Sequence, residues 1–295
     1  MSASLDHGLP QPAHDGTDAE ARPVFLTEPR VLGLPASAWP RILAPIVIGV
    51  LALALWEFVV RWKQIPPYIL PGPLLIGQTL VADWGTLSGS LLITLRITFM
   101  ALAAAIIFGV SLAVLFTQSK WLEMSLLPYA VILQVTPIVA IAPLIIIWAG
   151  DINLSLLICA WIVAFFPILS NTILGLNSAD HNLINFFQLY GATRWQTMRY
   201  LKLPAALPYF LAGLKISGGL ALIGAVVAEF VAGTGGTESG LAYRILEAGY
   251  QLKIPRVFAA LIMISMSGIA IFLATSWISH LLLRRWHESA LKREN

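Results

Sequence analysis

An acidic residue inside an apolar run is the first feature of this sequence that could do chemistry. Glu229 follows the apolar stretch 221–228 and precedes a glycine-rich sequence at 233–236. An ionisable side chain in nonpolar surroundings is costly, so such a residue usually has a function or a partner. We therefore expect Glu229 either to hold an external gate or to pair with a basic residue such as Arg244 or Arg256.

Three uncharged polar residues lie within other apolar runs, namely Gln134, Thr136 and Asn171. The same runs are interrupted by Pro137, Pro143 and Pro167. In a membrane, such interruptions are tolerated where they line a cavity or pack against neighbouring helices. The three polar residues are therefore expected either to line a solute path or to form hydrogen bonds between helices, with Ser265 and Ser267 as secondary candidates.

The sequence carries no arrangement typical of an enzyme. It lacks the glycine-rich phosphate loop that ends in Gly-Lys-Ser or Gly-Lys-Thr, so ATP binding of the usual kind is not expected. A single cysteine, Cys159, excludes an intrachain disulfide and a multi-cysteine metal site. The histidines are not spaced as metal ligands or placed beside a nucleophile; they are His7, His14, His181, His280 and His287. No catalytic residue, metal or other cofactor is predicted.

The composition is that of a membrane protein. Of the 295 residues, 58% are hydrophobic and 11% are charged, whereas a soluble domain carries about 25% charged residues. Six apolar runs are long enough to cross a hydrocarbon core of about 30 Å as helices. These runs are Ile42–Val60, Leu91–Phe116, Leu126–Ala149, Leu154–Leu176, Tyr209–Ala232 and Val257–Leu283. The expected fold is an all-α membrane protein with about six transmembrane helices in contact with lipid, and the net charge of +3 gives no reason to expect a nucleic-acid partner.

Lysine and arginine are distributed unequally between the two sides of this predicted bundle. They concentrate near both termini and between the fourth and fifth predicted helices. The positive-inside rule therefore predicts that both termini and the segment 177–208 are cytoplasmic. The segments 62–90 and 233–256 are then expected to face outward.

Polar tails are expected at both ends of the transmembrane domain. Residues 1–40 are polar and rich in proline, with no apolar period, so they are predicted to form a disordered cytoplasmic tail. They do not resemble a cleavable signal peptide. The transmembrane domain is predicted to cover 41–286, and residues 287–295 to form a short cytoplasmic tail.

The segment between the fourth and fifth predicted helices is too polar to span a membrane. Its residues 185–195 read Asn-Phe-Phe-Gln-Leu-Tyr-Gly-Ala-Thr-Arg-Trp. This pattern predicts a short helix, a tight turn at Gly191 and Ala192, and a second helix. Thr193 is the expected N-cap of that helix, with a glutamine three residues later in the position of a capping box, and Pro204 is expected to end it. A solvated hairpin that only joins two membrane helices would show the same pattern.

The residues that follow give this hairpin a specific resemblance. Gly191, nine further residues, and then Leu-Lys-Leu-Pro at 201–204 are similar to the cytoplasmic signature of bacterial ABC importer permeases. Other stretches resemble the branch of that family that serves nitrate, sulfonates, taurine and related small solutes. They are Ala142–Trp148, Phe166–Ile168, Leu203–Pro208, Ala212–Lys215 and Ala228–Phe230. The resemblance covers roughly residues 42–286.

This resemblance implies a function and a set of partners. The hairpin would be the coupling helix, which sits in a groove of a separate ABC ATPase subunit and carries its motion to the membrane helices. The implied coupling residues are Asn185, Phe187, Tyr190, Gly191, Ala192, Arg194, Trp195, Leu203 and Pro204. The chain would act in a bacterial inner membrane as a non-catalytic permease, as a homodimer, and with an extracytoplasmic solute-binding protein.

One part of the hairpin departs from the family pattern. The family usually has Glu-Ala-Ala from six to four residues before the glycine, and this chain has Asn185-Phe186-Phe187. An acidic contact is therefore missing, and aromatic rings replace two small side chains. The groove of the partner ATPase is expected to differ correspondingly.

Two other classes of protein were weighed against the permease. A self-contained secondary transporter would show internal repeats and paired intramembrane charges, and a membrane-embedded enzyme would show catalytic carboxylates or histidines. The sequence shows neither set of features clearly. The sequence does not identify the solute. Related permeases suggest several candidates, namely sulfonate, taurine, nitrate, bicarbonate, pyrimidine precursors and riboflavin.

Overall fold

The computed structural model describes residues 30–31, 34–35, 38–233 and 239–284, with side chains from residue 43 onward. Most of the predicted N-terminal tail and all of the predicted C-terminal tail lie outside these residues. The described elements are β1 (Arg30–Val31), β2 (Leu34–Pro35), α1 (Ala38–Trp62), α2 (Pro73–Ala82), α3 (Trp84–Gln118), α4 (Lys120–Val135), α5 (Ile138–Ala149), α6 (Ile152–Leu176), α7 (His181–Leu189), α8 (Arg194–Thr197), the π-helix η1 (Met198–Lys202), α9 (Leu203–Ala232), α10 (Leu241–Tyr250) and α11 (Ile254–Leu283). The two strands pair in antiparallel fashion, and the other elements are helices.

Two compact units make up the chain, and the division between them falls inside α1. The first unit ends at Leu55 and the second begins at Trp56. Every described side chain of the first unit, from Leu43 to Leu55, is exposed, and most of them are apolar. A helix surface that is apolar all round belongs in lipid or against another protein.

The membrane character expected from the composition is present in the helices. Five helical stretches are long and apolar enough to cross a membrane, and the bent pair α4–α5 makes a sixth if it is counted as one span. The five are Leu43–Trp62, Trp84–Gln118, Ile152–Leu176, Arg194–Ala232 and Ile254–Leu283. The prediction of an all-α membrane protein with about six transmembrane helices is confirmed.

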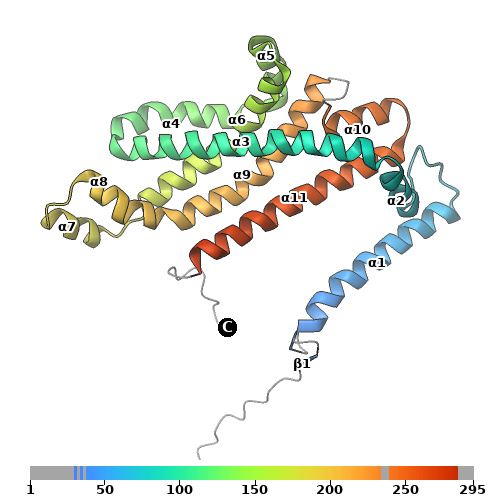
Figure 1. The fold of residues 1–295 in the computed structure, drawn as a ribbon, viewed down its shortest axis with the longest axis horizontal. Helices are drawn as coiled ribbons and strands as arrows, with labels where there is room; N and C mark the ends of the chain where they lie inside the picture. The colour runs from blue at the N-terminus through green and yellow to red at the C-terminus, as the bar shows by residue number, and fades with distance from the viewer. Residues whose placement is uncertain (1–29, 32–33, 36–37, 234–238, 285–295) are drawn as a thin grey trace, which may run out of the picture. The chain divides into compact units, whose positions relative to one another are not determined.

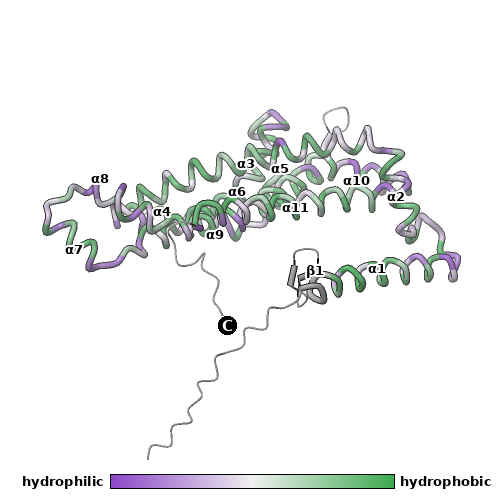
Figure 2. The backbone as a smooth tube through the Cα atoms, turned by 60° about the horizontal axis from the view of Figure 1, so that its bottom comes forward, coloured by the Kyte–Doolittle hydropathy of each residue, from purple (hydrophilic) through white to green (hydrophobic). Residues whose placement is uncertain are grey.

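In the second unit, polar sequence gathers at two ends. Figure 2 shows mostly hydrophobic helices in the middle of this unit and hydrophilic colours on α7 and α8 and on α2 and α10. We call the part that carries α7 and α8 the hairpin end, and the part that carries α2 and α10 the α10 end (Figure 1). The long helices α3, α6, α9 and α11 run between them.

Small residues allow α6 to pack closely on α9, and α3 covers another side of α6. A Cβ atom on Gly213 of α9 would lie 2.7 Å from the carbonyl oxygen of Pro167 on α6. A Cβ atom on Gly224 would lie 2.8 Å from the Cα atom of Ala160. Close approach through small residues is the usual way in which membrane helices gain packing contacts. The α6–α9 pair is therefore a tightly packed connection between the hairpin end and the α10 end.

The third predicted span, Leu126–Ala149, is not one straight helix. It consists of α4 and α5, which are bent by 103° at the break. Thr136 and Pro137 have extended backbone, with ψ of 124° and 116°. A proline lacks the N–H that the helix ladder needs and disfavours helical backbone in the residue before it, which explains the break. Pro143 and Pro167, by contrast, lie inside α5 and α6 without ending them.

Candidate functional site

At the hairpin end, α7 and α8 form the helical hairpin that the sequence predicts (Figure 1). Asp180 caps α7 by accepting a hydrogen bond from the N–H of Asn182 at 2.8 Å. Gly191 turns the chain with φ of 68°, a left-handed conformation that glycine adopts without strain. Thr193 Oγ1 accepts from Gln196 N at 3.2 Å, and Gln196 Oε1 accepts from Thr193 N at 2.7 Å. The predicted helix, turn and capping box are confirmed.

Large side chains of the hairpin are exposed. Neither α7 nor α8 contains a buried residue. Leu189 is 83% exposed, Tyr190 74%, Trp195 65% and Phe186 54%. The rings of Phe186 and Tyr190 are in contact at a centroid distance of 4.6 Å, with their planes tilted by 43°. Exposed aromatic residues grouped on a polar element are typical of protein–protein interfaces.

Two hollows flank the turn of the hairpin. The first has a volume of about 350 Å³ and is lined mainly by aromatic residues, namely Phe186, Phe187, Tyr190 and Tyr200, together with Gly191, Ala192 and Gln196. The second has a volume of about 230 Å³ and is polar and basic, since Arg194 and Lys202 contribute to it beside Gln118, Gln188, Thr117 and Thr197. The hairpin therefore offers an aromatic surface and a basic surface on either side of one turn.

The predicted coupling residues divide between these surfaces. Phe187, Tyr190 and Gly191 line the aromatic hollow, Arg194 lines the basic one, and Ala192 lies between the two and lines both. The other four lie outside both hollows, with Asn185 and Trp195 exposed on the hairpin and Leu203 and Pro204 at the start of α9. The sequence analysis missed Tyr200, whose spacing of four residues from Gln196 was the available signal for a shared helix face.

Pro204 does not end the second helix of the hairpin, so this prediction is wrong. The helix continues from α8 through η1 into α9, as one run from Arg194 to Ala232. At the π-helix, the N–H of Leu203 donates to the carbonyl of Met198, five residues earlier. This wider turn lets the chain pass Pro204, which has no N–H to donate, at the first turn of α9. The hairpin is therefore continuous with a membrane helix.

At the α10 end, a buried carboxylate holds the start of α10. Glu229 Oε1 accepts from Thr94 Oγ1 at 2.8 Å, and Glu229 Oε2 accepts from Ala242 N at 3.0 Å. Leu241 N donates to Thr94 Oγ1 at 2.9 Å. The first N–H groups of a helix have no partner within it, and a carboxylate there also interacts favourably with the helix dipole. Gly240 makes room, because a Cβ atom at this position would overlap the carboxylate.

The arginines that were predicted to pair with this glutamate bind elsewhere. Arg256 Nε lies 2.7 Å from Asp83 Oδ2. Arg244 donates to Ser90 Oγ at 3.1 Å and lies 2.9 Å from Glu247 Oε2. Among the described residues, the hydrogen bonds of Glu229 are made by a threonine hydroxyl and a main-chain N–H in place of the expected arginine. A gating role of the glutamate stays a prediction.

The three uncharged polar residues do not come together. Thr136 donates to Ile132 O at 2.7 Å, and Asn171 donates to Pro167 O at 2.9 Å, each within or at the end of its own helix. Gln134 is exposed on α4. A path-lining role of these residues stays a prediction. Within the residues that the structure describes, no group of three or more His, Cys, Asp or Glu side chains could hold a metal ion.

Comparison with known families gives a match over most of the helical region. Residues 105–288 match the family described as binding-protein-dependent transport system inner membrane component. The riboflavin transport system permease protein of Chloroflexus aurantiacus is 34% identical over 90% of this chain and 98% of its own length. The formylaminopyrimidine transport permease protein of Halalkalibacterium halodurans is 32% identical over 82% of this chain and 95% of its own length.

A similar fold is found among solved structures. A methionine ABC transporter in inward-facing conformations aligns with a TM-score of 0.58 over 68% of this chain and 98% of the matched chain. The sequence identity is 18%, so this likeness bears on the fold alone.

Proposed function

The chain belongs to the family of binding-protein-dependent transport system inner membrane components, and we propose that its α7–α8 hairpin docks on a separate ATPase subunit. The chain is thus a permease subunit of an ABC importer. The observation that carries the proposal is a hairpin of exposed aromatic residues whose second arm continues into the membrane helix α9.

The exposed groups of the hairpin suit insertion into a groove of another protein. Interface energy concentrates in a few aromatic or arginine anchors at the centre of a patch, surrounded by polar groups. Tyr190 and Trp195 supply exposed aromatic anchors, and Arg194 supplies a basic group beside them. Gly191 carries no side chain at the tip, so the backbone can approach the partner closely.

Coupling follows from the continuity of the helix. A closing motion of the ATPase that moves α8 also moves α9, because η1 joins them without a break. Since α9 packs closely on α6, the motion is passed along the bundle toward the α10 end. ATP binding then favours an outward-facing state and hydrolysis restores the inward-facing one, which is a shift between two conformational states.

The departure at Asn185-Phe186-Phe187 changes the chemistry of this contact. Phe186 packs against Tyr190, and Phe187 lines the aromatic hollow. We therefore propose that the groove of the partner ATPase is lined by apolar side chains at this position, where other ATPases would meet a carboxylate.

The orientation proposed for the chain places the hairpin end in the cytoplasm. Arg194, Arg199 and Lys202 lie at that end, which agrees with the positive-inside rule. Both termini are then cytoplasmic, in a bacterial inner membrane. Two copies of the chain would present two hairpins to a pair of ATPase subunits, and the solute path would run between the copies, with Gln134, Thr136 and Asn171 as candidate lining residues.

For the solute, the relatives suggest a chemical class. The two relatives described above are named as permeases for riboflavin and formylaminopyrimidine. We propose a small heterocyclic vitamin or precursor ahead of a sulfonate or nitrate, delivered by an extracytoplasmic binding protein. A self-contained secondary transporter is the alternative, and uptake by the purified chain alone in liposomes, driven by an ion gradient, would support it.

The docking proposal is tested by substitution at the tip of the hairpin. Gly191→Trp should weaken ATPase binding at least tenfold, because a large side chain at φ of 68° is strained and sits at the centre of the contact. The matched control is Gly77→Trp on α2, at an exposed glycine that also has open space around its Cβ position. Co-purification of the ATPase and the melting temperature of the permease would be measured for both. Normal ATPase binding by a folded Gly191→Trp variant would contradict the proposal.

A further inference from the structure

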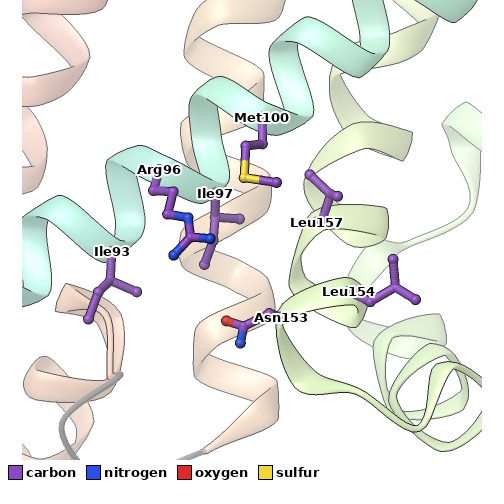
Figure 3. Close-up of a pocket in the computed structure, with 7 residues that line it drawn as sticks. All are labelled: Ile93, Arg96, Ile97, Met100, Asn153, Leu154 and Leu157. Atoms are coloured by element: carbon purple, nitrogen blue, oxygen red, sulfur yellow. The ribbon is translucent and has the colours of Figure 1, made fainter.

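A groove beside the start of α6 holds a basic residue that the proposed function does not use. It has a volume of about 470 Å³ and lies between α3 and α6. Its lining is apolar apart from Arg96 and Asn153. In Figure 3 the guanidinium group of Arg96 points toward the amide of Asn153 across the mouth of this groove.

The charge of Arg96 is not paired with any side chain in the part of the chain that the structure describes. None of the residues that the structure describes forms a hydrogen bond or an ion pair with it. The nearest acidic residue along α6 is Asp151, and its carboxylate caps that helix by accepting from Leu154 N at 2.7 Å. Arg96 is also the one charged residue of α3, a helix of 35 residues. A cation in an otherwise apolar membrane helix is costly unless an anion neutralises it. We therefore looked for an anion that is not part of the described residues.

Helix lengths place this cation at the surface of the hydrocarbon core. The 22 residues from Ile97 to Gln118 rise about 33 Å, which matches a core of about 30 Å. The 25 residues of α6 rise about 37 Å, and Asn153 is the second of them. Arg96 and Asn153 therefore lie at the level of lipid headgroups if Gln118 lies at the opposite surface.

The side of α3 that carries Arg96 is apolar and exposed. Leu92 is 68% exposed, Phe99 53%, Met100 47% and Ile107 63%. These positions recur at helical spacing on the side of Arg96. A path for a polar solute would be expected to carry more polar side chains than this one, whereas an exposed apolar stripe suits acyl chains.

We propose that the groove binds one phospholipid of the leaflet at the α10 end, through the phosphate of its headgroup. The planar guanidinium of Arg96 can donate two parallel hydrogen bonds to phosphate oxygens, and the amide of Asn153 can donate another. An acyl chain then lies along Ile97, Met100 and Leu157.

The proposal is tested by native mass spectrometry of the purified full-length chain, titrated with phosphatidylglycerol in detergent. The wild type should retain one lipid that Arg96→Gln binds at least tenfold more weakly, with Arg96→Lys in between because lysine keeps the charge without the paired geometry. Leu154→Trp should fill the groove and weaken the same lipid while Arg96 stays in place. Lys63→Gln is the matched control, since it removes an exposed cation outside the groove.

Three results would overturn the proposal. One is an equal number of retained lipids in the wild type and in Arg96→Gln. This would show that Arg96 does not bind the lipid and that its guanidinium group is solvated by water. Another is the absence of retained lipid in the wild type. The third is displacement of phosphatidylglycerol by millimolar hexanesulfonate or inorganic phosphate in the wild type, which would assign the groove to a free anion.

Discussion

The two ends of the second unit are held by different kinds of interaction. At the hairpin end, the side-chain hydrogen bonds of α7 and α8 are local, such as those between Thr193 and Gln196. At the α10 end, Glu229 and Thr94 are 135 residues apart in sequence and join α9, α3 and α10. The first end leaves aromatic side chains exposed, whereas the second buries a carboxylate that is 3% exposed.

This difference indicates which interactions stabilise each end. At the α10 end, Glu229 finds its hydrogen-bond partners within the chain, so the contact that joins α9, α3 and α10 should persist without a partner protein. The hairpin end has local caps and exposed anchors, so it gains most from a partner that covers it. Substitutions at the two ends should therefore affect different measurements.

The largest effect on folding is expected for Glu229→Ala. Removal of the carboxylate takes away the acceptor of Ala242 N–H and leaves Thr94 Oγ1 with Ser90 O as its acceptor, at 3.3 Å. This should lower the free energy of unfolding by about 2–4 kcal/mol. Unfolding by SDS in mixed micelles gives this value, and hydrogen exchange should become faster at Leu241 and Ala242. ATPase binding at the hairpin end should change far less.

Two variants sharpen this prediction. Glu229→Gln keeps one oxygen acceptor and should lose less stability than the alanine variant. Glu247→Ala removes a carboxylate at the same end whose side chain is 27% exposed and belongs to a partly exposed ion pair, so its cost should be smaller, at about 1 kcal/mol. Equal losses of unfolding free energy in Glu229→Ala and Glu247→Ala would show that the buried carboxylate contributes no more to stability than the partly exposed one.

At the hairpin end, Tyr190→Ala should have the opposite profile. The side chain is 74% exposed, so its loss should change the free energy of unfolding by less than about 0.5 kcal/mol. As a central aromatic anchor it should contribute about 2 kcal/mol to ATPase binding, or roughly a thirtyfold change in affinity. Binding to the ATPase in nanodiscs measures this, and unchanged affinity would show that the anchor lies elsewhere.

The long helices and the hairpin could be predicted from the sequence, whereas the short helices could not. The long helices were found because a membrane-spanning helix needs a continuous apolar run, and the predicted ends at Leu176, Ala232 and Leu283 agree with α6, α9 and α11. The hairpin was found because a glycine turn and a capping box are local signals. The short helices α2 and α10 were missed because the segments 62–90 and 233–256 were interpreted only as connections that face outward.

The remaining errors have specific physical causes. Pro204 was taken as a stop because an α-helix cannot pass a proline without losing a hydrogen bond, but the π-helix before it relieves this conflict. The partner of Glu229 was sought among arginines because side-chain type is what a sequence displays. A main-chain N–H is present in almost every residue, so the sequence does not show which one will bind the carboxylate. The fold brings the N–H of Ala242, at the start of α10, to Glu229.

The smallest effect is expected from restoring the family pattern in the hairpin. Replacing Asn185-Phe186-Phe187 by Glu-Ala-Ala should improve binding of an ATPase from a system that carries Glu-Ala-Ala by a few fold, which corresponds to less than about 1 kcal/mol. Binding of the chain's own ATPase should weaken, since the ring contact of Phe186 with Tyr190 is lost. Equal activity of both chains with both ATPases would show that this departure has no bearing on partner choice.

The most direct test of the difference between the two ends is cysteine cross-linking to the ATPase in the assembled transporter. Leu189 on α7 is 83% exposed and Tyr250 on α10 is 82% exposed, so Leu189→Cys and Tyr250→Cys form a matched pair. The native Cys159 is buried and can stay in place. We expect Leu189→Cys to cross-link to the ATPase and Tyr250→Cys not to. Cross-linking from Tyr250→Cys, or from neither position in a complex that still couples ATP hydrolysis to transport, would contradict it.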